Sequence, residues 1–120
     1  MDLFEYQGKQ FFASYDIPVS PGDVATTVDD AVAVAERVAD YPVVVKAQVH
    51  AGGRGKAGGI QLAATASEAE EHAARILGMD IRGHVVHRLW IERASDIARE
   101  YYLSVTFDRG EKKPLFMLTT

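Results

Sequence analysis

A strand-like segment near the middle of the chain carries polar side chains at alternating positions. Lys46, Gln48 and His50 alternate with apolar residues, and a β-strand places alternate residues on one face. Residues 51–59 follow directly and contain five glycines. Because glycine has no Cβ, its backbone N–H groups can approach phosphate oxygens closely, and Lys46 can add a point charge. These residue types predict a site that holds phosphate groups.

Two familiar phosphate-binding loops do not account for this glycine run. The run contains the letters of G-x-G-x-x-G, but that fingerprint needs a helix that starts inside the loop, whereas residues 60–63 alternate like a strand. The P-loop pattern fails because Ala57 follows Lys56 where a serine or threonine would meet magnesium. What remains is a flap between two strands, to which Arg54 and Lys56 add positive charge.

The same residues also have ordinary structural interpretations. Taken alone, Lys46 would more often be a solvent-facing strand lysine, and the glycine run could be a mobile exposed loop. Five glycines in so short a run carry a large ordering cost, however, and are seldom kept for a plain hairpin. His50 could in principle accept a phosphoryl group, but a histidine beside a glycine loop is more often a hydrogen-bonding support.

The composition excludes several other classes of protein. The net charge of -4 argues against a broad surface for nucleic acid or an anionic membrane, and no stretch is long enough to span a bilayer. The absence of cysteine excludes disulfides and thiolate zinc sites and fits a cytoplasmic protein. The four histidines have no metal-ligand spacing, so no metal site is expected among them; they are His50, His72, His84 and His87.

The elements that must position this site follow from periodicity and capping signals. Helical spacing predicts a first helix over residues 3–15 with an aromatic face, a second from a Thr27 cap to about Asp40, and a third from a Ser67–Glu70 capping box to a stop at Gly78. Alternation and β-branched residues predict strands over residues 23–25, 42–50, 60–63, 85–93, 100–107 and 115–118, the last after a turn at residues 108–110. The pattern is an α/β (α+β) fold with a mixed or mainly antiparallel sheet.

The length bounds the domain organisation. A chain of 120 residues with 48% hydrophobic content is large enough for one globular domain and too short for two ordinary ones. We therefore expect residues 1–120 to form a single domain. The chain stops at Thr120 without a cap or closing helix, which suggests that this domain is part of a longer protein.

Two motifs resemble the β subunit of succinyl-CoA synthetase, also called succinate–CoA ligase. They are LFEYQGKQ at residues 3–10 and, above all, VVKAQVHAGGRGKAGG at residues 44–59. The resemblance continues through ERASDIAREYYL at residues 92–103 and through Phe116 and Met117, so it covers essentially the whole chain.

The resemblance implies the N-terminal part of an ATP-grasp fold, in which two lobes close over a nucleotide. It implies an enzyme of the tricarboxylic acid cycle that interconverts succinyl-CoA and succinate and couples this to ATP or GTP. In this family a histidine of the partner α subunit carries the phosphoryl group, so no catalytic residue is expected in this chain. The ligands for Mg²⁺ and the part that binds CoA are expected beyond Thr120, and the chain alone is expected to be inactive.

The family's nucleotide contacts carry over to particular residues. Lys46 matches the phosphate-contacting lysine, and Gly53, Arg54 and Gly55 match the glycine flap over the nucleotide. Residues that match the base and ribose side are Glu92, Ser95 and Glu100. The placement of Glu92 depends on a segment between Gly78 and Glu92 that is shorter than in some members. Without the family, both carboxylates would more often be ordinary exposed side chains.

Other interpretations stay open at this point. The chain could be a non-catalytic module that binds nucleotide or docks another subunit through its aromatic first helix. Malate–CoA ligase shares the same architecture. Ser20 lies in a linker that approaches the base in the family, but its identity does not decide between ATP and GTP.

Overall fold

The structure is a computed structural model that describes residues 2–38 and 41–120. Within these ranges the helices are α1 (Glu5–Ala13), α2 (Val28–Val38) and α3 (Ala66–Ile76). The strands are β1 (Gly22–Ala25), β2 (Val43–Ala47), β3 (Ile60–Ala63), β4 (Asp80–Ile81), β5 (His84–Val85), β6 (Leu89–Arg93), β7 (Tyr102–Asp108) and β8 (Lys113–Thr119). None of the described helices has the length and apolarity that a bilayer crossing requires.

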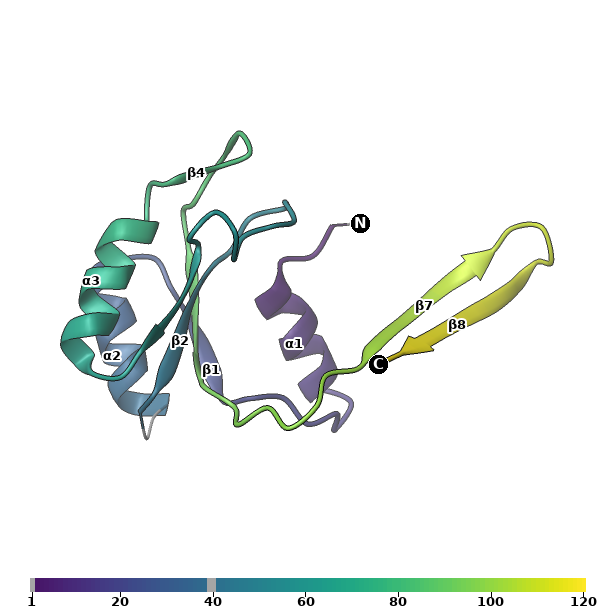
Figure 1. Ribbon diagram of the computed structural model, residues 1–120, viewed down its shortest axis with the longest axis horizontal. Helices are drawn as coiled ribbons and strands as arrows, with labels where there is room; N and C mark the ends of the chain where they lie inside the picture. Colours follow the sequence, from purple (N-terminus) through teal and green to yellow (C-terminus); the bar gives the residue numbers. More distant parts are fainter. Residues whose placement is uncertain (1, 39–40) are drawn as a thin grey trace.

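The centre of the molecule is a four-stranded antiparallel sheet in the order β1-β6-β2-β3. Helices α2 and α3 lie on one face of this sheet, and α1 lies on the opposite side (Figure 1). The remaining strands form two hairpins, β4-β5 and β7-β8. The expected α+β fold with a mainly antiparallel sheet and packed helices is confirmed.

The core lies between the sheet and helices α2 and α3. Strand β2 has alternating burial, with Val43, Val45 and Ala47 fully buried against the helices. Leu89 and Ile91 of β6 occupy the same layer. The helices contribute small and branched side chains: Ala31, Val34, Ala35, Ala69, Ala73 and Ile76. The opposite face of β2 and β6 is thereby left for other side chains.

The helix caps confirm one sequence prediction and correct another. Thr27 Oγ1 accepts a hydrogen bond from Asp30 N at 3.1 Å, as expected for the start of α2. The end predicted near Asp40 lies outside the described residues. The Ser67–Glu70 box was wrong, because α3 starts two residues earlier, with Thr65 Oγ1 accepting from Glu68 N at 3.2 Å. Both pairs have the same spacing, so the pattern could not choose between them.

Three predicted strands are shorter than expected. The strand predicted over residues 42–50 ends at Ala47, so Gln48 and His50 lie beyond β2. The strand predicted over residues 85–93 is divided: β5 pairs with β4, and only β6 joins the central sheet. The strand predicted from Glu100 begins at Tyr102. The predicted turn before the last strand is confirmed, since Asp108 Oδ1 accepts from Gly110 N at 2.9 Å and from Glu111 N at 3.0 Å.

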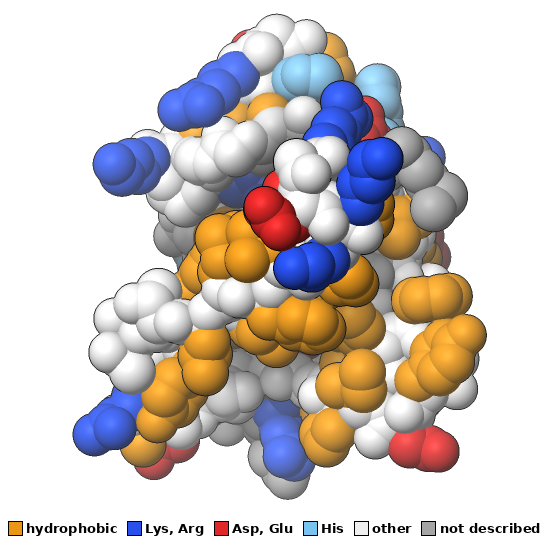
Figure 2. Space-filling view, turned by 90° about the vertical axis from the view of Figure 1, so that its right-hand side faces the viewer, with side chains coloured by type: hydrophobic (Ala, Val, Ile, Leu, Met, Phe, Trp, Pro, Cys, Tyr) orange, Lys and Arg blue, Asp and Glu red, His pale blue; other side chains and the backbone are white. Residues whose placement is uncertain are grey.

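Hairpin β7-β8 extends away from the rest of the molecule (Figure 1). The apolar side chains of the hairpin are exposed on both of its faces, and those on the outer side of α1 are exposed as well. Figure 2 shows hydrophobic side chains gathered across this end of the molecule. The exposed residues include Leu3, Phe11, Phe12 and Tyr15 near α1 and Leu103, Val105, Phe107, Phe116 and Leu118 in the hairpin. The aromatic face predicted for the first helix therefore points outward, and the polar face of α1 is turned to the sheet.

Replacing Gly22 with alanine is expected to lower the free energy of unfolding by about 1–3 kcal/mol. A Cβ at this position would lie 2.6 Å from the Trp90 ring and 2.7 Å from the carbonyl oxygen of Ile91, so the sheet would have to shift. Gly8→Ala is the matched control: its Cβ would meet nothing within 4 Å, and a helical alanine should add roughly 0.5–1 kcal/mol. Urea unfolding of both variants measures the difference, and equal stabilities would contradict the expected clash.

Candidate functional site

The sheet face turned away from α2 and α3 brings charged side chains of two strands together. In the register of β2 and β6, Lys46 lies opposite Trp90, and Val44 lies opposite Glu92. Alternation puts these side chains on the face that α1 overlies. Glu92 and Trp90 are almost fully buried there, with relative exposures of 5% and 3%. A buried carboxylate requires partners, because desolvation penalises its charge.

Glu92 has three such partners. Its carboxylate accepts hydrogen bonds from the ammonium groups of Lys46 and Lys9, and from Trp90 Nε1 at 2.6 Å. Lys46 comes from β2, Lys9 from α1 and Trp90 from β6, so Glu92 connects the helix to the sheet. These contacts satisfy the buried charge and fix the position of Lys46.

Glu5 of α1 holds the same lysine and the glycine flap. Its carboxylate lies 3.2 Å from Lys46 Nζ, 3.7 Å from Lys9 Nζ and 2.7 Å from Arg54 Nη1. Arg54 Nη1 also donates to the carbonyl oxygen of Ala47 at 2.8 Å, which fastens the flap to the end of β2. Gln48 completes the contact, because its Oε1 accepts from the backbone N–H of Tyr6 at 3.1 Å.

The glycine run forms a compact flap between β2 and β3. Gly53 and Gly58 adopt φ angles of +79° and +83°, which residues with a side chain rarely tolerate. Inside the flap Ala57 N donates to the Gly53 carbonyl at 3.1 Å, and Gly59 N donates to the Arg54 carbonyl at 2.8 Å. The glycines thus allow a tight turn that directs Arg54 back toward Lys46, whereas Lys56 is exposed. The expected strand–flap–strand arrangement is confirmed.

The charges in this cluster shift one another's pKa values. Burial acts to raise the pKa of the Glu5 carboxyl, but Lys46 and Arg54 outweigh it and lower that pKa from 4.5 to about 2. Burial likewise opposes ionisation of Glu92, yet hydrogen bonds from Lys46, Lys9 and Trp90 keep its pKa below the ordinary value. Burial acts to lower the pKa of Lys46, but Glu92 and Glu5 raise it. All three groups are therefore charged at neutral pH.

Acid is expected to weaken the fold between about pH 4.5 and 2. Because the folded-state pKa values of Glu5 and Glu92 lie below their unfolded values, their ion pairs contribute fully above pH 4.5, and this contribution is lost as the pH falls through the folded pKa, about 2 for Glu5. The contribution of Lys46 depends on pH in the opposite direction. Because its folded-state pKa is raised, this contribution is lost only as the pH rises above 10.5. Urea unfolding as a function of pH measures the effect. Glu5→Gln should flatten the acid limb, and an equally steep loss in this variant would contradict the assignment.

The structure assembles part of the residue set that the sequence predicted. Lys46 and Arg54 share the Glu5 carboxylate, and Glu92 pairs with Lys46 directly. Gly53 and Gly55 lie in the flap beside them. Ser95 lies elsewhere: its hydroxyl is 3.1 Å from that of Ser20, at a pocket of about 480 Å³ formed with residues 18–21. Glu100 is exposed, and no ion pair to it occurs among the described residues.

Sequence reasoning missed three members of the cluster. Glu5 and Lys9 lie four residues apart on α1, which is the spacing of an ion pair on one helical face, but the aromatic residues are the stronger pattern in that helix. Trp90 alternates with Ile91 along β6 and so shares the face of Glu92. The i, i+4 signal was available from the sequence; the packing of α1 across the sheet was not.

The arrangement suits the binding of an anionic ligand. Three cationic side chains converge with two carboxylates, so the local charge is positive in a protein whose net charge is -4. A flap with bare glycine N–H groups borders it. Within residues 2–38 and 41–120, no cluster of three or more His, Asp or Glu side chains could hold a metal ion.

Comparison with known protein families gives one match that spans the chain. Residues 2–120 match the family model described as "ATP-grasp domain". The match covers the cluster, the flap and both hairpins, which is consistent with the fold seen in Figure 1.

Solved structures with the same fold come from Ca. Korarchaeum cryptofilum. One is a dinucleotide-forming acetyl-coenzyme A synthetase 1 in complex with coenzyme A, acetyl-coenzyme A and a phosphorylated phosphohistidine segment. It superposes with a TM-score of 0.76 at 20% sequence identity, over 97% of this chain and 51% of that one. A complex of the synthetase with coenzyme A and Ca-AMPCP gives 0.75 at 22% identity, over 98% and 52%. The protein ACD1 with coenzyme A gives 0.81 at 21% identity, over 98% and 53%. The chain therefore spans about half the length of these structures.

Proposed function

Because the chain belongs to the ATP-grasp family, we propose that it forms the nucleotide-holding part of a succinate–CoA ligase β subunit. The complete enzyme would interconvert succinyl-CoA and succinate and couple this reaction to ATP or GTP. The observation that carries the proposal is the Lys46 cluster: a lysine held at the base of a glycine flap, with the flap's arginine turned toward the same carboxylate. The long motif at residues 44–59 supports the choice of this ligase within the family.

In the proposed site, Lys46 and Arg54 hold the nucleotide phosphates. In the structure both cations are bound to the Glu5 carboxylate, which occupies them as a phosphate oxygen would. An incoming phosphate has to compete with Glu5, so this carboxylate keeps the two cations in place while the site is empty. Gly53 and Gly55 leave room for the phosphates to approach the flap backbone.

The remaining predicted residues would serve the nucleoside. The Ser95 hydroxyl lies beside that of Ser20, and both residues line the pocket described above. Glu92 would accept hydrogen bonds from ribose hydroxyls through the carboxylate lone pairs that its three partners do not use. Glu100 is proposed to complete this side from the segment that leads into β7.

Magnesium and the partner subunit belong to the proposal as well. Bound Mg²⁺ would neutralise phosphate charge, and its protein ligands are proposed to lie outside this chain. The acyl and CoA chemistry is likewise proposed to lie outside residues 1–120. A histidine of an α subunit would receive the phosphoryl group, and residues 1–120 would position the nucleotide as a single domain.

A substrate assay of the complete enzyme tests the proposal. The β subunit assembled with its α partner is expected to form ADP or GDP from the triphosphate when CoA and succinate are both present. Acetate should give a rate at least about tenfold lower, because a site built to pair the second carboxylate of succinate rejects an acid that lacks it. Malate keeps both carboxylates and adds a hydroxyl, so it is expected to turn over more slowly than succinate because that hydroxyl needs room and a hydrogen-bond partner. Faster turnover with malate would indicate malate–CoA ligase, and faster turnover with acetate would indicate an acetyl-CoA synthetase. Nucleotide binding without turnover would leave a binding module.

A further inference from the structure

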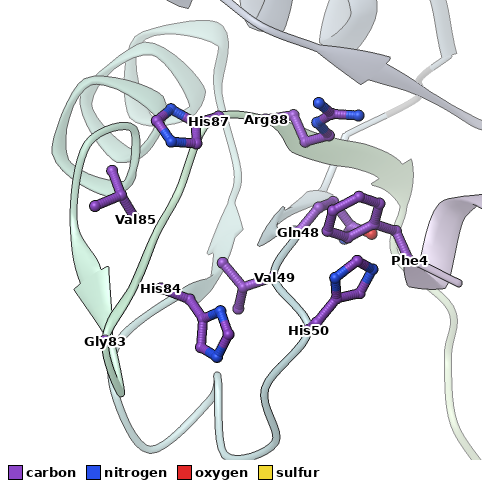
Figure 3. Close-up of a pocket in the computed structure, with 9 residues that line it drawn as sticks. All are labelled: Phe4, Gln48, Val49, His50, Gly83, His84, Val85, His87 and Arg88. Carbon is purple, nitrogen blue, oxygen red and sulfur yellow. The ribbon is translucent and has the colours of Figure 1, made fainter. Parts of the chain in front are cut away.

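A second concave site lies beside the first residues of α1, away from the Lys46 cluster. The pocket has a volume of about 330 Å³ and is formed where the chain leaves β2 and enters β6. Figure 3 shows His50, His84, His87 and Arg88 around it, with Phe4 and Gln48 at one side. None of its lining residues is an aspartate or a glutamate. Three imidazoles and a guanidinium without a carboxylate are an unusual lining for a protein with net charge -4.

Arg88 and His50 are held in place by aromatic contacts that leave donors free. The Phe4 ring stacks on the His50 imidazole with ring centroids 3.9 Å apart and an interplanar angle of 13°. The Arg88 guanidinium lies 5.1 Å from the centroid of the same ring, and its Nη1 donates to the Tyr6 hydroxyl at 3.3 Å. Among the described residues, no carboxylate pairs with Arg88. Most of its five N–H donors therefore remain available.

We propose that this pocket binds a phosphate group, either inorganic phosphate or the phosphate of a small monoester. A tetrahedral oxyanion offers several acceptor oxygens to donors that converge from different sides, and a guanidinium pairs with it in a bidentate manner. The site is distinct from the proposed nucleotide site, because neither Lys46 nor Arg54 nor Glu92 lines it. Gln48 separates the two, since its amide contacts Glu5 and Tyr6 on one side and the pocket on the other.

Two carboxylates that contact residues of the pocket lining already have other partners. Asp80 Oδ1 accepts a hydrogen bond from Gly83 N at 2.9 Å, and Glu5 is bound to Lys46 and Arg54. Arg82, on the turn between β4 and β5, adds a further cation near the flap, 3.1 Å from where a Cβ of Gly53 would lie. Arg88, which lines the pocket, therefore favours an anion there.

The proposal is tested by following the histidine ring NMR signals of the 120-residue chain during a titration with inorganic phosphate. The signals of His50, His84 and His87 are expected to shift and saturate, while that of His72 on α3 stays unchanged. Arg88→Gln should weaken binding about tenfold or more, the loss typical of a charge-assisted hydrogen bond. Arg99→Gln is the matched control, since Arg99 also donates to a tyrosine hydroxyl, that of Tyr101 at 3.5 Å, but does not line the pocket. It should bind as the wild type does.

Further titrations distinguish free phosphate from a monoester as the ligand and distinguish this pocket from the proposed nucleotide site. A titration with glycerol 2-phosphate, compared with inorganic phosphate, shows whether a monoester or the free ion binds more tightly. The double variant His84→Gln, His87→Gln should weaken phosphate binding, because it removes two imidazoles from the pocket lining. Lys46→Ala should leave the histidine shifts unchanged, which distinguishes this site from the nucleotide site. Unsaturable shifts, equal binding by Arg88→Gln and wild type, or loss of the shifts in Lys46→Ala would each overturn the proposal.

Discussion

Lys46→Ala is expected to lower kcat/KM for the nucleotide by about tenfold to 150-fold in the complete enzyme. A charge-assisted hydrogen bond contributes roughly 1.5–3 kcal/mol, and each 1.4 kcal/mol corresponds to a factor of ten. The structure gives a reason to expect the upper part of this range. Lys46 is oriented by Glu5 and Glu92, so little rotamer freedom remains to be lost when a phosphate binds.

The matched control is Lys113→Ala, which removes an exposed lysine that pairs with Glu111 at 3.3 Å on hairpin β7-β8. It should change kcat/KM less than twofold or so, because exposed ion pairs contribute little. Loss of Lys46 also leaves Glu92 with fewer cations, so the melting temperature has to be measured beside the kinetics. A variant that stays folded at the assay temperature yet keeps the wild-type rate would refute the role given to Lys46.

Glu92→Ala is expected to lower the free energy of unfolding by about 3–5 kcal/mol, the usual cost of removing one partner of a buried ion pair. Glu92 is 5% exposed, and its removal leaves Lys9, Lys46 and Trp90 Nε1 without their common acceptor. Lys9 comes from α1 and Lys46 from β2, so the loss also loosens the contact between the helix and the sheet.

Glu100→Ala provides the comparison for Glu92, since the same family resemblance singles out both carboxylates. Glu100 is exposed and should change stability by no more than about 0.5 kcal/mol. Urea unfolding monitored by tryptophan fluorescence measures both variants. Equal effects at the two positions would mean that the buried cluster does not stabilise the fold in the way its geometry indicates. A rate loss in Glu100→Ala at unchanged stability would support a direct contact with the nucleotide.

The sequence predicted the elements that have strong periodic patterns. The alternation of Val43, Val45 and Ala47 placed β2 with the correct face in the core, and the Thr27 signal located the start of α2. Glycine spacing identified the flap and excluded two other loop types. These features depend on neighbours within a few residues, which a pattern can report.

The features that it did not predict depend on long-range packing. Glu5 meets Lys46 and Arg54, which are far away in sequence, and only the position of α1 over the sheet brings them together. The same position explains why the aromatic side of α1 faces outward. Thr65 and Ser67 match the capping pattern equally well, and in the structure Thr65 is the N-cap of α3.

Because hairpin β7-β8 projects from the sheet lobe, the free energy of unfolding measured for the lobe should not apply to the hairpin. The sheet lobe has a buried core, whereas in the described part of the chain the hairpin strands pair with each other and with no other strand. An isolated two-stranded hairpin is marginally stable in water. Backbone amides should therefore exchange with solvent quickly in β7 and β8 and slowly in β2 and β6, as two cooperative units. Trp90, the single tryptophan, reports only on the lobe. Tyr101 and Tyr102, which are exposed at the start of the hairpin, report on the other unit.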